Sequence, residues 1–378
     1  MLYLSSSRLR GASKLPELNE LNIDDKRNTR ARFEQWVKNP QCEANALSAV
    51  LNVKMSEVAT SVGYQPEFGQ SPFAITRGFQ FESWLFKENA KVLHSALVKA
   101  SMLSETESGL LDLRLTMNGG PKLKSIDAAI SESHALLSNL SEKVNFTPPS
   151  IIAGLALRIP KGVMLPEATL IIDAAIITKS QDKFSIKVGE IKVFPDRGGH
   201  TDPGEIATAR AQAGVYQHAL DLTVASLNLK NPPIVDTKGF LVFTWPGTNS
   251  PVIRPNEDLT FQALRAEQGF ERLDEIALRL VKEKAESGSD ADPLAWVLHS
   301  KTEYRESCWS FCDLAARCQD LAFDDDRGII LGREAARTLG SVKVARAIEL
   351  MDGAAANTAF EASLQAQLQS ANWEALNK

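Results

Sequence analysis

Three β-rich runs that follow one another at residues 150–194 constrain the fold of this chain more than any other feature. They read IIAGLALRIP, ATLIIDAAIIT and FSIKVGEIKVF, separated by short polar or Pro/Gly-containing segments, and they predict an antiparallel meander. A helical pattern follows at residues 203–222, and then GFLVFTWPG, whose β-branched and aromatic residues before Pro-Gly indicate another strand. We therefore expect an α/β fold with a mixed central β-sheet flanked by helices.

Helical patterns on both sides of these strands predict helical N-terminal and C-terminal additions. We expect four parts along the chain: a helical N-terminal region at residues 1–70, a core at 71–286 with a helical insertion at about 98–148, a cysteine-rich segment at 294–320, and a helical tail at 321–378. The segment ESGSDADP has the composition of a loop and suggests the boundary near Ser287.

Composition limits where the chain acts and what it binds. No apolar run approaches the roughly 20 residues of a membrane helix, so we expect a cytoplasmic protein without membrane contact. The formal net charge is −5, so a nucleic acid would have to bind a local basic groove rather than the overall field of the protein. Four cysteines in a large intracellular chain are more typical of free thiols, catalytic groups or metal ligands than of a disulfide framework.

Two acidic residues and a lysine in the β-rich runs are the candidate catalytic groups. Asp173 interrupts the apolar run LIIDAAII, where a carboxylate is costly to bury without compensation. On the next run Glu190 and Lys192 share one face, because side chains alternate along a strand. Adjacent strands would bring Asp173 beside Glu190, and two convergent carboxylates make an oxygen site for Mg²⁺ or Mn²⁺. The alternative is a surface Glu/Lys pair on an edge strand with a satisfied Asp.

Gln212 and Tyr216 extend this pattern, because residues four apart share one face of the helix that follows. Their amide and phenol groups could reach over the sheet to a metal or a phosphate. The alternative is an ordinary amphipathic helix with Tyr216 packed at its margin.

In order and spacing, these residues resemble the D, E-x-K and Q-x-x-x-Y series of RecB-like PD-(D/E)xK nucleases. That family has an upstream motif, Gly-x-x-apolar-His, whose histidine helps to bind the metal, and the matching segment here runs from Gly78 to Glu82. Glu82 stands at the position of the histidine, and a carboxylate there is compatible with Mg²⁺ or Mn²⁺. A helix-surface Glu82 is the alternative.

The resemblance implies a fold, an activity and roles for these residues. It implies a restriction-endonuclease-like core and a deoxyribonuclease that depends on Mg²⁺ or Mn²⁺, with an exonuclease favoured over an endonuclease. The implied metal ligands are Glu82, Asp173 and Glu190, and the implied catalytic residues are Asp173, Glu190, Lys192, Gln212 and Tyr216. DNA, as a single strand or at an end, is the expected substrate, and a helicase is a possible partner protein.

The cysteines also carry a resemblance. Cys42 precedes the nuclease motifs, and Cys308, Cys312 and Cys318 follow them in CWSFCDLAARC. This order is similar to the iron–sulfur staple of AddB-type and CRISPR-adaptation nucleases, although their downstream spacing is C-x2-C-x5-C and this chain has C-x3-C-x5-C. The resemblance implies a 4Fe-4S cluster bound by all four thiolates. A four-thiolate zinc site and buried unligated cysteines are the alternatives.

The expected function is therefore phosphodiester hydrolysis in DNA repair, CRISPR adaptation, or phage-related or defence DNA processing. The rival expectation is a catalytically silent DNA-binding or scaffold subunit of a helicase–nuclease assembly.

Overall fold

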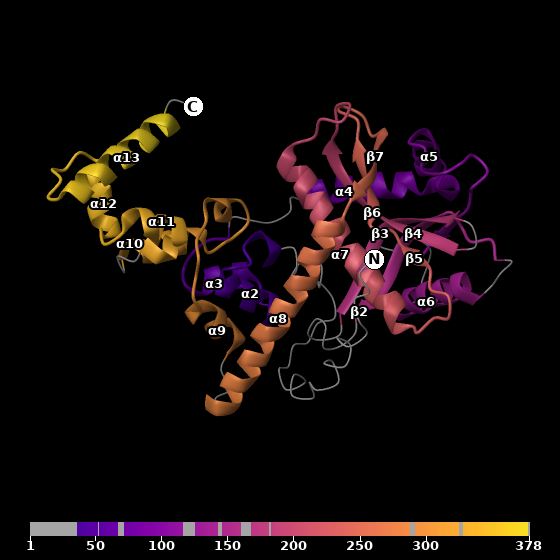
Figure 1. Cartoon of the computed structure of the whole chain (residues 1–378), viewed down its shortest axis with the longest axis horizontal. Helices are drawn as coiled ribbons and strands as arrows, with labels where there is room; N and C mark the ends of the chain where they lie inside the picture. Colours follow the sequence, from indigo (N-terminus) through magenta and orange to yellow (C-terminus); the bar gives the residue numbers. More distant parts are fainter. Residues whose placement is uncertain are drawn as a thin grey trace. The chain divides into compact units, whose positions relative to one another are not determined.

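The chain folds into two compact units (Figure 1). The computed structural model describes residues 36–51, 53–66, 72–115, 125–142, 146–159, 168–180, 183–287, 292–324 and 328–376. Unit 1 holds the described residues between Gln70 and Leu278, and unit 2 holds those of Ala31–Gly69 and Arg279–Lys378. The described part of the expected N-terminal region that precedes Gly69 thus shares a unit with the cysteine-rich segment and the tail.

A seven-stranded mixed sheet forms the centre of unit 1, which confirms the expected α/β class with a sheet flanked by helices. The strands are β1 (Leu110–Asp112), β2 (Ile151–Ile159), β3 (Ala168–Ser180), β4 (Lys183–Pro195), β5 (Ile234–Val235), β6 (Lys238–Thr244) and β7 (Pro251–Asp258). Their order is β1-β2-β3-β4-β6-β7, and β5 pairs with β4. The predicted meander is confirmed in the antiparallel strands β2, β3 and β4, whereas β4 and β6 are parallel.

The first face of the sheet packs against helices α4 (Pro72–Leu85) and α5 (Lys87–Lys99). Apolar side chains of both helices, including Phe81 and Leu93, form one core cluster with Ile191 of β4 and Val242 of β6. Because side chains alternate along a strand, the neighbours of Ile191 on β4 point to the opposite face.

Helices α6 (Ile126–Glu142) and α7 (Pro203–Ser226) cover that second face, where α6 packs Ile130 against Ala156 of β2. Helix α7 starts at a strong N-terminal signal: the Asp202 side chain accepts hydrogen bonds from the Gly204 and Glu205 amides, and Pro203 occupies the first turn. Gly214 of α7 lies so close to Gln262 that an added Cβ would be 2.3 Å from the Gln262 Cβ. This glycine therefore lets α7 approach the start of α8 (Thr260–Ser287).

Unit 2 is built from two segments that are far apart in the sequence, Ala31–Gly69 and Arg279–Lys378. Its helical elements are α2 (Glu43–Leu51), α3 (Met55–Ser61), α9 (Pro293–His299), η5 (Glu306–Ser310), α10 (Ala315–Asp324), η6 (Gly328–Leu331), α11 (Arg333–Leu339), α12 (Val344–Met351) and α13 (Ala359–Leu376). Distant segments meet directly, since the Ala44 amide donates to the Lys301 carbonyl and Tyr64 donates to Asp320 over 2.6 Å.

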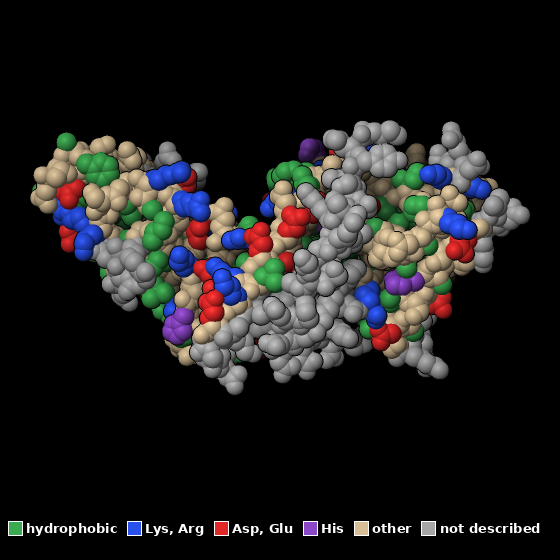
Figure 2. Space-filling model, turned by 60° about the horizontal axis from the view of Figure 1, so that its bottom comes forward, with side chains coloured by type: hydrophobic (Ala, Val, Ile, Leu, Met, Phe, Trp, Pro, Cys, Tyr) green, Lys and Arg blue, Asp and Glu red, His purple; other side chains and the backbone are tan. Residues whose placement is uncertain are grey.

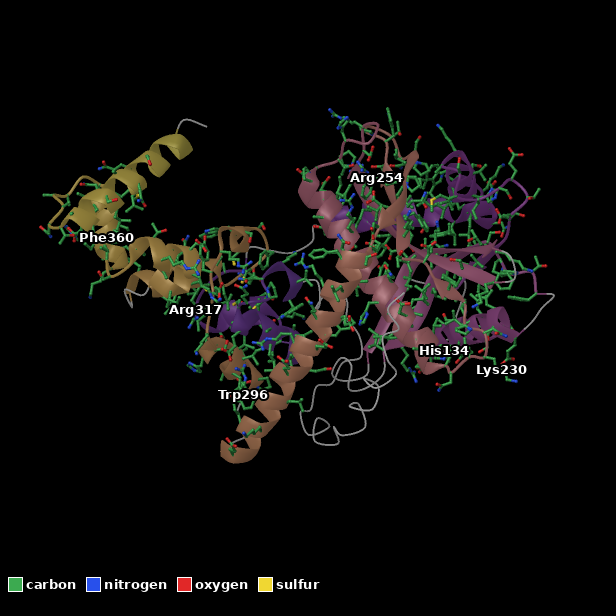
Figure 3. The ribbon with its side chains drawn as sticks, viewed as in Figure 1. His134, Lys230, Arg254, Trp296, Arg317 and Phe360 are labelled. Atoms are coloured by element: carbon green, nitrogen blue, oxygen red, sulfur yellow. The ribbon has the colours of Figure 1, made fainter. Side chains whose placement is uncertain are left out.

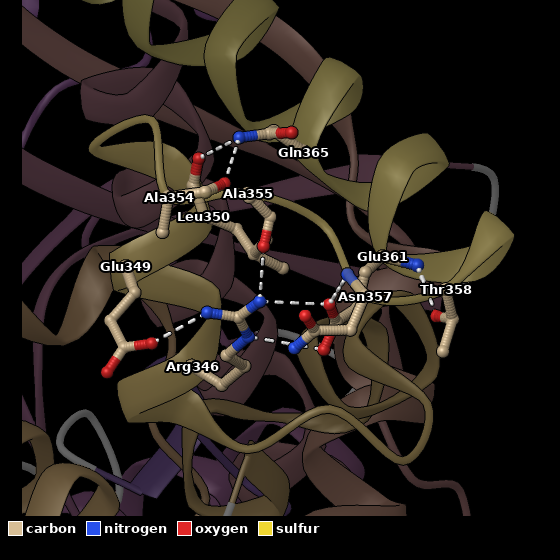
Figure 4. Close-up of polar contacts among 9 residues, drawn as sticks. All are labelled: Arg346, Glu349, Leu350, Ala354, Ala355, Asn357, Thr358, Glu361 and Gln365. Atoms are coloured by element: carbon tan, nitrogen blue, oxygen red, sulfur yellow. Dashed lines mark hydrogen bonds and ion pairs between the residues drawn. The ribbon is translucent and has the colours of Figure 1, made fainter.

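Within unit 2, α11, α12 and α13 share a small core that contains Leu339, Leu350 and Leu364. A polar network fastens the connection between α12 and α13 (Figure 4). Arg346 binds both carboxylate oxygens of Glu361 at 3.2 and 3.0 Å, and it also donates to Glu349 and to the Ala355 carbonyl. Among the described residues of both units, no helix is long and apolar enough to cross a membrane.

Candidate functional site

The predicted catalytic residues of the sheet lie on β3 and β4, two neighbouring strands in its interior. The antiparallel register pairs Ala174 with Gly189, so Asp173, one residue before Ala174, stands beside Glu190, one residue after Gly189. Strand β4 lies between β3 and β6. Asp173 and Glu190 therefore lie on adjacent strands, on the face that α7 covers.

Two hydrogen bonds fix the carboxylate of Asp173. The Tyr216 hydroxyl of α7 donates to Oδ1 over 3.1 Å, and the Ile191 amide of β4 donates to Oδ2 over 3.2 Å. These contacts orient the carboxylate from two neighbouring elements, helix α7 and strand β4. Tyr216 is buried, and its hydroxyl bonds to Asp173, so the alternative of a phenol packed at the helix margin is wrong.

Glu190 and Lys192 form an ion pair whose two members differ in exposure. The Lys192 Nζ lies 2.9 Å from Glu190 Oε1; the Glu190 side chain is 0% exposed and that of Lys192 is 21% exposed. The alternative of a surface pair on an edge strand is therefore wrong, because β4 is an interior strand and Glu190 is fully buried. A buried carboxylate needs a cation or hydrogen bonds to offset its desolvation, and Lys192 provides one cation.

Gln212 occupies the same side of α7 as Tyr216, one helical turn earlier, and its side chain is buried. The structure thus brings Asp173 together with Tyr216, and Glu190 together with Lys192, around strand β4 and helix α7.

Glu82 is held in a different set of contacts. The carboxylate lies 3.8 Å from the guanidinium of Arg114, which is buried and binds both carboxylate oxygens of Asp112. The guanidinium also lies over the Phe86 ring, 4.4 Å from its centroid. Gly154, with φ of +69°, makes room for Arg114, since an added Cβ would meet it at 2.9 Å. Glu82 is therefore part of an ion-pair group between α4 and the end of β1.

A second buried carboxylate that the sequence patterns did not indicate lies just past β4. Asp196 is 0% exposed and accepts hydrogen bonds from the Gly199 amide and the Thr201 hydroxyl, and its Oδ2 lies 2.7 Å from Nε of Arg254. Arg254, labelled in Figure 3, comes from β7 and also donates to the Gly199 carbonyl. Burial alone would raise the pKa of Asp196, but these hydrogen bonds and the Arg254 charge lower it overall. The contacts hold the loop between β4 and α7.

The carboxylates of Asp173 and Glu190 are the candidate ligands of a divalent cation. Among the residues that the structure describes, no three His, Cys, Asp or Glu groups lie close enough to hold one metal ion. Mg²⁺ is commonly bound in proteins through one or two carboxylates, with waters and substrate phosphates completing its shell. Asp173 and Glu190 are the pair that fits this requirement.

All four cysteines line a single cavity in unit 2. The cavity is nearly filled by the surrounding side chains, with a volume of about 10 Å³; Cys42 comes from the first sequence segment of unit 2, and Cys308, Cys312 and Cys318 come from the second. The four thiols are free and buried. The one cysteine before the nuclease motifs and the three after them therefore meet in one place in the fold.

The surroundings of these sulfur atoms act on their charge in two ways: burial favours the neutral thiol, and hydrogen bonds to sulfur favour the thiolate. Burial raises the pKa of Cys42 and Cys312 and raises that of Cys318 to about 12. Hydrogen bonds to sulfur oppose this rise: the amides of Glu303 and Leu314 serve Cys42 and Cys312, and the Thr302 side chain serves Cys318. Thiols of this kind lose their protons when a cation takes the protons' place. The four residues therefore supply the ligand set of a thiolate-bound cluster, whereas no three of the described His, Cys, Asp or Glu side chains lie close enough in this structure to hold a single metal ion.

Charges of both signs are interspersed on the face of the molecule in Figure 2, among the side chains drawn in colour.

Comparisons of the chain with models of known protein families, with curated proteins and with solved structures give no match.

Proposed function

We propose that the chain is a metal-dependent DNA nuclease with a restriction-endonuclease-like core, acting on single-stranded DNA or DNA ends. The observation that carries the proposal is the arrangement at β4: Asp173 and Glu190 on adjacent strands, with Lys192 bonded to one and Tyr216 to the other. Burying Glu190 fully and Asp173 partly in the middle of a sheet costs free energy that a purely structural strand would not need. The preference for DNA, and for an exonuclease over an endonuclease, rests on the resemblance in sequence.

The residues divide the work of hydrolysis. Asp173 and Glu190 would hold Mg²⁺ or Mn²⁺, which supplies Lewis-acid polarisation of the phosphodiester and lowers the pKa of water. Tyr216 and the Ile191 amide keep the Asp173 carboxylate oriented. The water oxygen forms a bond to phosphorus while one P–O ester bond breaks, and the leaving oxygen gains a proton as the water loses one. Lys192 places positive charge where the phosphate accumulates negative charge, with Gln212 as a supporting contact.

We further propose that Cys42, Cys308, Cys312 and Cys318 hold a 4Fe-4S cluster. The shared cavity and the hydrogen bonds to sulfur support a thiolate-bound group there. Such a group would join residues 31–69 to residues 279–378, the two sequence segments of unit 2, much as a metal clip closes a long loop. Zinc accepts the same four ligands, so iron, acid-labile sulfide and zinc should be measured in the chain as purified.

The second candidate is a scaffold or DNA-binding subunit without catalysis. The ion pair between Glu190 and Lys192 favours it, because a lysine that neutralises the acid can stabilise a fold without any metal. A scaffold would bind DNA equally with Mn²⁺ and with EDTA, and it would cut none.

The deciding experiment is cleavage of end-labelled single- and double-stranded DNA by anaerobically purified protein in Mg²⁺, Mn²⁺ or EDTA. We expect metal-dependent cleavage that Asp173→Asn, Glu190→Gln and Lys192→Ala each reduce at least a hundredfold, on the order of 2.7 kcal/mol in the barrier. Lack of cleavage by folded wild-type protein on both DNA forms would leave the scaffold as the better proposal.

Lys187→Ala is the matched control. Lys187 lies on β4 like Lys192, has a side chain that is 20% exposed, and is also paired with a carboxylate, Asp236, at 3.5 Å. Its odd-numbered spacing from Lys192 places it on the opposite face of the sheet. This variant should therefore cleave like wild type, and an equal loss in both lysine variants would show a general effect on the strand.

A further inference from the structure

Asn39 is a buried polar residue beside the cysteine cavity, and no sequence motif singled it out. Its side chain is 1% exposed and lines the same cavity as the four thiols. The side-chain Nδ2 donates to the Glu303 carbonyl over 2.7 Å and to Cys308 Sγ over 3.5 Å. The backbone amide of Arg305 is a second donor to the same sulfur, at 3.3 Å. Cys308 therefore has two N–H donors of different kinds.

The two ends of the Asn39 side-chain amide differ in their contacts. Its buried Oδ1 receives no hydrogen bond within the described part of the chain. An unsatisfied buried acceptor costs free energy, whereas an apolar side chain of similar size would not incur that cost. The two hydrogen bonds of the Asn39 side chain both come from Nδ2, and one of them ends on sulfur.

A neutral thiol is a weak acceptor, but a thiolate is a strong one, because hydrogen bonds to a charged acceptor are roughly twice as strong as neutral ones. The Asn39 contact thus has its greatest effect when Cys308 carries negative charge as a ligand. Hydrogen bonds to the sulfurs are among the factors that set the reduction potential of an iron–sulfur cluster.

We propose that Asn39 is a positioning residue for the cluster, which donates an N–H···S hydrogen bond to the Cys308 thiolate and thereby raises the reduction potential and protects the cluster from oxidation. The inference rests on the proposed cluster. The added electron increases negative charge at the sulfurs, so a donor there stabilises the reduced state more than the oxidised one.

The test compares the full-length wild-type chain with Asn39→Ala after anaerobic reconstitution. Iron and sulfide are counted first, the potential is then measured by reductive titration, and the bleaching of the visible absorbance in air is timed. Asn39→Ala should keep the wild-type iron content, because all four thiols remain. Its potential should shift to a more negative value, and its absorbance should bleach faster.

Asn45→Ala is the matched control within the same cavity. Asn45 is also 1% exposed and lines the cavity, but its Nδ2 donates to the Trp36 and Asn39 carbonyls. Its backbone amide, which serves Cys42, is kept in the variant. This variant should therefore have the wild-type potential and bleaching rate.

The outcomes separate this inference from the proposed function. A wild-type chain with zinc, or with neither metal, would remove the cluster and the inference together, whatever the DNA-cleavage result. An iron–sulfur chain in which Asn39→Ala matches wild type in both readouts, or in which both asparagine variants change equally, would overturn the role of Asn39 alone. If Asn39→Ala loses iron, Asn39→Asp takes its place in the test, because this variant keeps the size of the side chain but lacks the N–H donor. The cluster of Asn39→Asp should bleach faster than that of the wild type. Bleaching at the wild-type rate would overturn the inference.

Discussion

Tyr216 and Asp173, which are 43 residues apart in the sequence, are joined by a hydrogen bond of 3.1 Å between the phenol and the carboxylate. The bond links α7 to β3, and the backbone of β4 holds the other Asp173 oxygen through the Ile191 amide. Three elements therefore determine where one carboxylate points. An acid that is to hold a cation gains from such orientation, because its rotamer is set before the cation arrives.

Tyr216→Phe should test this orientation with little change in packing, because only the hydroxyl is lost. A hydrogen bond to a charged group contributes about 2 kcal/mol, so we expect cleavage to fall roughly tenfold or more. The dependence on Mg²⁺ concentration should move to higher concentrations. Cleavage rates at several Mg²⁺ concentrations, together with the unfolding midpoint in urea, would measure both effects.

Tyr64→Phe is the control for that change. Tyr64 also donates to an aspartate, Asp320, over 2.6 Å, but the pair is exposed and belongs to unit 2. Tyr64→Phe should leave the Mg²⁺ dependence of cleavage unchanged. If Tyr216→Phe has the same Mg²⁺ dependence as wild type, Tyr216 does not orient a metal ligand.

Local patterns in the sequence predicted the centre of unit 1 well. The runs that became β2, β3, β4 and β6 and the helix α7 are long and have clear apolar or alternating character. Strands β1, β5 and β7 were not predicted. β1 and β5 contain three and two residues, and β7 reads PVIRPNED, which is polar for a strand. Such strands form because a neighbouring strand offers unpaired backbone groups, which no local pattern records.

The candidate site was predicted where short-range spacing carried the information. Glu190 and Lys192 are two residues apart, and Gln212 and Tyr216 are four apart. Long-range partners were missed because they depend on the folded chain. Arg254 meets Asp196 across 58 positions and Asn39 meets Cys308 across 269. The grouping of Glu82 with Arg114 likewise depends on strand β1, which lies inside the region expected to be a helical insertion.

Asp196→Asn should make the stability of unit 1 less dependent on pH. The folded pKa of Asp196 is lowered, because hydrogen bonds and Arg254 outweigh the effect of burial. A lowered folded pKa contributes stability that is fully present above the unfolded pKa of about 4 and is lost as the pH falls through the folded pKa. We therefore expect a destabilisation of about 3 kcal/mol near pH 7, and this difference should shrink below about pH 4. Urea unfolding of both proteins from pH 7 to pH 3 would measure it.

The control for Asp196 is Asp127→Asn. Asp127 also pairs with an arginine, Arg158, at 2.7 Å, but the side chains are 72% and 42% exposed. Exposed pairs contribute about 0–1 kcal/mol, so this variant should differ little from wild type at any pH. If the difference in unfolding free energy between wild type and Asp196→Asn stays constant down to pH 3, the stability contributed by Asp196 does not depend on its ionisation.

Arg346→Ala should loosen the connection between α12 and α13. Arg346 lowers the pKa of Glu361 through their hydrogen bonds, and the same carboxylate accepts the Asn357 amide over 2.6 Å. Without the guanidinium, Glu361 loses its strongest partner, and we expect faster hydrogen exchange at the Asn357 amide. Arg337→Ala is the control. Arg337 pairs with Glu334 at 3.0 Å, and both side chains are at least 75% exposed. This variant should leave the hydrogen exchange of the Asn357 amide unchanged. Equal exchange at Asn357 in wild type and Arg346→Ala would mean that the apolar core around Leu350 holds these helices without the network.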